Sequence, residues 1–211
     1  MTNPIDDLVN DLEPVSPRPL RHLALRWILP ALTISTLFVV LWIGVRPDMP
    51  GALTLPSFWV KLVAMVAIAA GAALSLFALS RPDGTGGRGL VVSMLVAGLV
   101  LAAGLIVLAI APSDLRTETL LGHSWNRCVP RVIAAALPVF AASILVLRAM
   151  APTRLRLAGF AAGLFAGAAG AAVYSLSCTE TSLTFLAVWY QGAVLIVALL
   201  GALMGPRLLR W

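Results

Sequence analysis

Residues 157–177 read LAGFAAGLFAGAAGAAVYSLS and contain no charged side chain. A helix of about 20 apolar residues crosses the roughly 30 Å of hydrocarbon in a lipid bilayer. Gly163, Gly167 and Gly170 stand among alanines, and small residues of this kind let a neighbouring membrane helix approach closely. The stretch therefore predicts a membrane-spanning helix that packs tightly within a bundle.

Five further stretches have the same apolar character, so we expect six spans that fill most of the chain. The 211 residues are 60% hydrophobic and 11% charged, with a mean hydropathy of +0.97, whereas soluble domains are about a quarter charged. The sequence predicts an all-α polytopic membrane protein with six transmembrane helices. The expected spans are Ile28–Val45, Phe58–Leu79, Leu90–Ala111, Val132–Met150, Leu157–Ser177 and Leu183–Met204.

The distribution of basic residues predicts the orientation of these spans. Cytoplasmic connections of membrane proteins carry an excess of Lys and Arg. One side of the predicted bundle has ten such residues: Arg18, Arg21, Arg26, Arg81, Arg88, Arg148, Arg154, Arg156, Arg207 and Arg210. The other side has five: Arg46, Lys61, Arg116, Arg127 and Arg131. We therefore expect both termini in the cytoplasm. The net charge of +6 reflects membrane topology rather than direct binding of nucleic acid.

The first 13 residues, MTNPIDDLVNDLE, form an acidic amphipathic segment. Ile5, Leu8, Val9 and Leu12 share one face of a predicted helix. Because four acidic residues and no basic residue accompany this face, we expect it to bind a basic groove on a cytoplasmic protein. A solvated tail and a helix lying on the membrane are the alternatives, and anionic inner leaflets disfavour the second.

The chain has two cysteines, Cys128 and Cys178, on either side of the predicted turn between the fourth and fifth spans. Antiparallel helices of similar length would bring both cysteines to the same height, at the outer surface. An oxidising compartment would allow a structural disulfide there. A redox switch or thiol sensor is the second interpretation. A thiolate site for a soft metal, with His123 and Glu180 nearby, is the third.

No other pattern indicates catalysis or a cofactor. The spans carry no ionisable residue at a central position, which counts against an ion-coupled transporter. GHS at residues 122–124 is not a nucleophile elbow, and no phosphate-binding loop or zinc motif occurs. Most of the six tryptophans, Trp125 among them, fall near membrane boundaries, as in an interfacial belt. Trp189 and Tyr190 lie deeper, where we expect them to pack against the outer hairpin.

Several motifs resemble the NrsF-type family of bacterial inner-membrane anti-sigma factors, which inhibit an extracytoplasmic-function (ECF) sigma factor. They are LGHSWNRCVP at 121–130, YSLSCTETSLTFLAVWY at 174–190, GPRLLRW at 205–211, RPDMPGALTLPSFWVKL at 46–62 and the acidic start DDLVNDLEPV. The resemblance spans essentially the whole chain, and the two cysteine motifs are its most specific part. The family often has His-Cys-Pro-Glu at the second cysteine. Here residues 177–180 are Ser-Cys-Thr-Glu, which weakens the metal-ligand interpretation.

The resemblance implies a regulator with two parts and no enzymatic activity or cofactor. Residues 1–26 would be a cytoplasmic acidic segment that binds the sigma factor, and residues 27–211 a six-helix sensory domain in the inner membrane. Cys128 and Cys178 would read a periplasmic heavy-metal or oxidative signal, with His123, Trp125, Glu180, Trp189 and Tyr190 in support. The expected sigma-factor contacts are Asp6, Asp7, Leu8, Asp11 and Leu12. A soft-metal or thiol transporter component, and a structural protein braced by a disulfide, are the alternatives.

Overall fold

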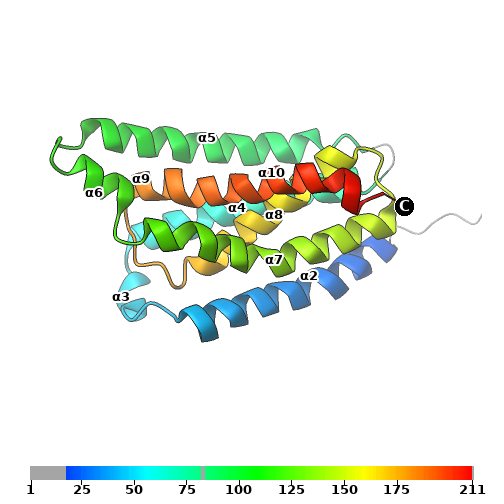
Figure 1. Cartoon of the computed structure of the whole chain (residues 1–211), viewed down its shortest axis with the longest axis horizontal. Coiled ribbons are helices and arrows are strands. Elements are labelled where there is room, and N and C mark those ends of the chain that lie inside the picture. The colour runs from blue at the N-terminus through cyan, green and yellow to red at the C-terminus, as the bar shows by residue number, and fades with distance from the viewer. Residues whose placement is uncertain (1–17, 82–83, 211) are drawn as a thin grey trace, which may run out of the picture.

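The computed structural model describes residues 18–81 and 84–210, and this part of the chain is helical without a strand (Figure 1). Six of its helices are long and apolar enough to cross a membrane, which confirms the six predicted spans. The elements in chain order are α2 (Arg18–Phe38), η1 (Val39–Ile43), α3 (Met49–Ala52), α4 (Pro56–Leu79), α5 (Gly87–Ile110), α6 (Arg116–Leu121), α7 (Trp125–Met150), α8 (Leu155–Tyr174), α9 (Leu183–Phe185), η2 (Leu186–Tyr190) and α10 (Gln191–Leu208).

The long helices alternate in direction and form one bundle (Figure 1). The short helices α3, α6 and α9 lie together at one end, which we name the α6 end. Helix α2 begins and α10 finishes at the opposite end, which we name the α10 end. Six consecutive spans with short connections produce this arrangement, since an even number of crossings returns the chain to its starting side.

Helix α8 is the centre of the bundle and packs against α4, α7 and α10. Its small residues explain this position, because a Cβ atom added at Gly159 would meet the carbonyl oxygen of Gly201 on α10. An added Cβ at Gly163 would likewise meet the carbonyl oxygen of Val197, and one at Gly170 would lie 2.7 Å from the amide nitrogen of Ala136 on α7. The predicted close contact of this helix is therefore confirmed.

The outer helices are attached by small and hydroxylated residues. Ser35 on α2 donates a hydrogen bond of 2.6 Å to the carbonyl oxygen of Ala135 on α7. Ser93 on α5 donates one of 2.9 Å to the carbonyl oxygen of Ile68 on α4. A Cβ added at Gly89 would meet the backbone of Gly71, so α4 and α5 also touch through glycine. Large apolar side chains on the outward faces remain for contact with lipid.

Replacing Gly159 with alanine should destabilise the bundle by about 1–3 kcal/mol, because the new methyl group would push α8 away from α10. Gly98 on α5 provides the matched control, since an added Cβ there has no neighbouring atom within 4 Å. Unfolding of both variants in detergent micelles would measure the difference. Equal stability of Gly159→Ala and Gly98→Ala would contradict the role assigned to the α8–α10 crossing.

Candidate functional site

Cys128 and Cys178 lie in one buried cluster at the α6 end, although fifty residues separate them in the sequence. Cys128 is in the first turn of α7, and Cys178 follows the end of α8. Their exposed fractions are 0% and 3%. The hairpin geometry correctly predicted that the two residues lie at the same end of the bundle. That this end is the outer one stays a prediction. The aromatic residues Tyr174, Phe185 and Tyr190 belong to the same buried cluster.

Both cysteines are free thiols in this structure. The disulfide therefore stays a prediction. Within residues 18–81 and 84–210, no three His, Cys, Asp or Glu side chains gather in a way that could hold a metal ion. His123 is exposed, and its backbone amide rather than its ring contacts Glu180. Of the residues considered for a metal site, the structure brings the two cysteines together in one cluster, whereas His123 is exposed.

Glu180 organises the start of α7. Its carboxylate accepts a hydrogen bond of 2.7 Å from the amide nitrogen of His123 and one of 3.0 Å from the hydroxyl of Ser124. A negative charge at this position interacts favourably with the positive end of the helix dipole. Gly122 precedes this contact with φ of +55°, a conformation that suits glycine. Glu180 therefore positions the helical turn that carries Cys128.

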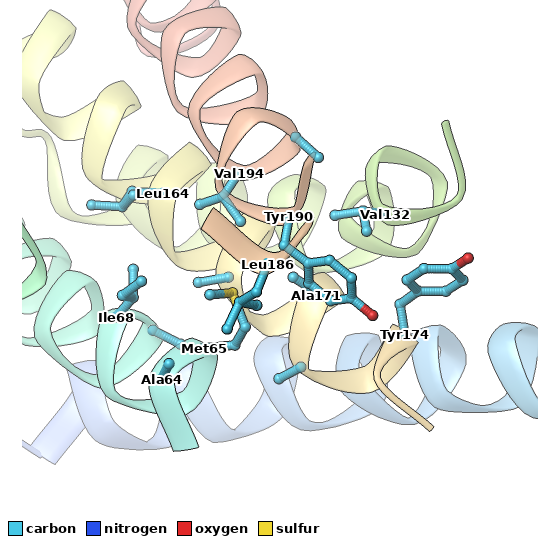
Figure 2. Packing of buried hydrophobic residues seen from close by; sticks show 14 of the residues in the cluster. Ala64, Met65, Ile68, Val132, Leu164, Ala171, Tyr174, Leu186, Tyr190 and Val194 are labelled. Carbon is cyan, nitrogen blue, oxygen red and sulfur yellow. The ribbon is translucent and has the colours of Figure 1, made fainter. Parts of the chain in front are cut away.

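Aromatic residues form the cover of the cluster. Trp125 and Trp189 stack with ring centroids 5.3 Å apart, and the Trp189 indole donates a hydrogen bond of 2.8 Å to the carbonyl oxygen of Leu120. Tyr174 and Tyr190 lie side by side with centroids 5.9 Å apart (Figure 2). Tyr190 is fully buried, and its hydroxyl lies near Cys178 without a hydrogen bond of good geometry. The predicted packing of Trp189 and Tyr190 at this end is confirmed.

Sequence reasoning missed two buried cations beside Cys178. Arg46 and Lys61 are each only 4% exposed, although we had counted both as topological charges. The Arg46 guanidinium donates a hydrogen bond of 3.3 Å to the carbonyl oxygen of Cys178. The Lys61 ammonium donates to the carbonyl oxygens of Cys178 (3.2 Å) and Glu180 (2.7 Å). One signal was available, since Lys61 is the only lysine in the chain.

Arg46 also forms an ion pair with Asp48 through two hydrogen bonds of 2.8 and 2.7 Å. This hydrogen-bonded contact raises the pKa of Arg46 and lowers the pKa of the Asp48 carboxyl below its ordinary value. Because the pKa of Asp48 is lowered, the pair is intact above the ordinary carboxyl range of about pH 4. It breaks only as the pH falls through the lowered value. Asp48 is half exposed, so solvent screens the pair.

Two π-helical turns border the same cluster. One is η1, which ends the first span at Gly44, and the other is η2, which carries Tyr190. The amide of Gly44 closes η1 by donating to the carbonyl oxygen of Val39, and Gly44 itself has φ of +88°. Wide turns of this kind are rare in helices and occur often at functional sites. Their location supports the α6 end as the candidate site.

The predicted sigma-factor contacts precede the part of the chain that the structure describes. Asp6, Asp7, Leu8, Asp11 and Leu12 all lie outside the described residues. The first described helix, α2, begins at Arg18 and continues into the first membrane span. Helix α2 is thus the membrane helix that follows the acidic segment directly in the sequence.

The fold and the site define a six-helix membrane protein with a pair of buried thiols and two buried cations at one end. The chain belongs to the NrsF family, negative regulator of sigma F, which matches residues 8–211. The Anti-sigma-F factor NrsF of Caulobacter vibrioides is 40% identical over 98% of this chain and 99% of its own. The Probable anti-sigma-F factor NrsF of Azospira oryzae is 38% identical over 84% of this chain and 83% of its own. No solved structure matches the chain.

Replacing Glu180 with alanine should destabilise the protein by about 1–2 kcal/mol, because the start of α7 would lose a charged acceptor. Alkylation of Cys128 should become faster, because the first turn of α7 keeps this thiol buried and would open more often without Glu180. Glu118→Ala is the control, because Glu118 is an exposed carboxylate at the same end. Unfolding in detergent and the rate of thiol labelling would test the prediction. It would be wrong if the two variants behaved alike.

Proposed function

We propose that this protein is a membrane anti-sigma factor that holds an ECF sigma factor inactive at the cytoplasmic membrane. The observation that carries the proposal is the family match from residue 8 to residue 211, together with a relative named as an anti-sigma-F factor along nearly its full length. Such a protein acts by binding and release and needs no enzymatic reaction or cofactor.

The proposed orientation puts the α10 end in the cytoplasm and the α6 end in the periplasm. The basic residues predict this orientation, with ten on one side and five on the other. The structure adds support, because two of the five, Arg46 and Lys61, are buried in hydrogen bonds. Because these two cations serve contacts inside the protein, they do not count toward the topological charge of the α6 end. The excess of basic residues at the α10 end is therefore larger than ten against five.

The proposed partner site is the acidic segment within residues 1–26. Asp6, Asp7 and Asp11 would face basic side chains of the sigma factor, while Leu8 and Leu12 would enter an apolar groove. A short helix of this length is marginal alone in water and gains stability when its apolar face is covered. Residues 27–211 would form the sensory domain that controls this contact.

The proposed input is a change in the bonding of Cys128 and Cys178. Two thiols in one buried cluster suit a soft heavy-metal ion or an oxidant, since both react with sulfur. Burial would keep the thiols inert in the resting state and make the response depend on small reagents or local opening. To shift binding from 99% to 1%, the signal must change the relative stability of the two states by about 5.5 kcal/mol.

The double substitution Asp7→Arg, Asp11→Arg should abolish co-purification of the full-length protein with the ECF sigma factor encoded beside it, because both changes place positive charge against a basic surface. Glu118→Arg at the α6 end is the matched control and should retain binding. Pull-down from solubilised membranes would measure both. If the double variant retains the sigma factor, the acidic segment is not the binding site. If the unmodified protein does not bind a sigma factor, the proposed function is wrong.

The substitutions Cys128→Ser and Cys178→Ser should leave resting sigma-factor binding unchanged and remove its loss on exposure to a thiol-reactive metal such as cadmium. Serine has nearly the size and shape of cysteine and lacks the reactive sulfur, so the fold should persist. Transcription from a sigma-dependent promoter, with and without cadmium, would report release. A full response by both serine variants would exclude the cysteines as the input.

A further inference from the structure

Four hydrogen bonds attach the turn formed by residues 176–180 to Arg46, which lies between η1 and α3, and to Lys61 in the first turns of α4. The amide nitrogen of Arg46 donates to the carbonyl oxygen of Leu176 over 3.1 Å. The Arg46 side chain donates to the carbonyl oxygen of Cys178, and Lys61 donates to the carbonyl oxygens of Cys178 and Glu180. The peptide group of Cys178 therefore receives two buried cations from a part of the chain more than a hundred residues away. We name Arg46 and Lys61 the cation clamp.

Lys61 depends on this turn for its stability. No carboxylate of the described residues lies within ion-pair distance of its ammonium, because the carboxylate of Glu180 is directed to the start of α7. Its charge is balanced by two carbonyl oxygens and by the ring of Tyr190, whose centroid lies 5.4 Å from the ammonium nitrogen. A buried ammonium that loses its acceptors is strongly unfavourable. A displacement of the turn away from Lys61 is therefore unfavourable unless Lys61 moves with it.

The clamp is joined to the first membrane helix by a short segment. Gly44 lies two residues before Arg46 and ends η1, and Val39 at the start of η1 is fully buried. Along the rest of its length α2 packs mainly against α7, with Ser35 as a buried contact. At the α6 end the position of α2 is therefore connected to Cys178 through Arg46.

We propose that Arg46 and Lys61 are positioning residues that transmit a change at Cys178 to α2. A new bond at the Cys178 sulfur reorients its peptide group, the carbonyl oxygen leaves the clamp, and the segment of residues 44–48 separates from the turn. The end of α2 then becomes free to shift along α7. The consequence for a bound sigma factor rests on the function proposed above, whereas the link between Cys178 and residues 44–48 does not.

The first experiment tests that link without a sigma factor. Full-length Cys128→Ser protein in lipid nanodiscs is treated with methyl methanethiosulfonate, which converts the Cys178 thiol to a methyl disulfide and releases methanesulfinate. Hydrogen exchange is then followed by mass spectrometry. Exchange in residues 44–48 should accelerate about tenfold or more at the Arg46 amide, because this amide loses its hydrogen bond to the carbonyl oxygen of Leu176 when the clamp opens. The Cys178→Met variant, whose side chain has nearly the shape of the adduct, should show the same acceleration without reagent.

The second experiment tests the clamp itself. Lys61→Gln should exchange quickly in residues 44–48 before treatment and change less than about twofold on modification. Lys61→Arg should restore the slow exchange and the response, because it keeps the positive charge. Arg127→Gln is the control, since Arg127 is an exposed cation at the same end. It should behave as the unmodified protein does.

The outcomes separate this inference from the proposed function. If exchange in residues 44–48 stays within twofold in both the modified protein and Cys178→Met, the coupling is wrong, whether or not a sigma factor binds. If exchange responds but the sigma factor is not released, the coupling holds and the proposed signalling role fails. Because Lys61→Gln opens the clamp without a signal, this variant should bind the sigma factor more weakly at rest and show no further release on addition of cadmium. An unchanged release by Lys61→Gln would also overturn the clamp.

Discussion

Where α8 crosses α10, the backbones of Gly159 and Gly201 meet with no side chain between them. This contact brings the two helices close together, and α4 and α7 then pack against the remaining faces of α8. In a bilayer there is little hydrophobic drive for helices to associate, so close van der Waals packing must supply the stability. The position of every other span follows from this crossing, including α7 with Cys128 and the end of α8 that leads to Cys178.

The α6 end differs in its physical character from the rest of the bundle. Along the spans apolar side chains, glycines and a few serine hydroxyls make the contacts, whereas here charged groups converge on the turn of residues 176–180. Glu180 attaches this turn to the start of α7, and the cation clamp attaches it to α4 and to the segment that follows η1. A buried polar network of this kind is stable when its partners are satisfied and costly when one is lost. Loss of one hydrogen bond at this turn is therefore expected to weaken the others, which is the basis of the proposed coupling.

The amino-acid sequence was sufficient for the six spans, for the close contact made by the fifth span and for the meeting of Cys128 with Cys178. Membrane spans can be read locally, because backbone groups in lipid must be satisfied within each helix and apolar length alone marks them. The glycines of residues 157–177 indicated tight packing, since in a membrane helix small side chains allow close approach. The family resemblance carried by the cysteine motifs was confirmed by the match over residues 8–211.

Tertiary structure alone decided the burial of the two thiols, the contact of Glu180 with residues 123 and 124 and the placement of Arg46 and Lys61. A basic residue near the end of a span has the same sequence pattern whether it faces water or a buried carbonyl group. The acceptors of Lys61 are backbone oxygens of Cys178 and Glu180, and a backbone carbonyl has no signature in the sequence. The sequence by itself therefore determined which segments cross the membrane. Only the folded chain, by bringing residues 46, 61 and 178 together, decided how the thiol site is connected to the first helix.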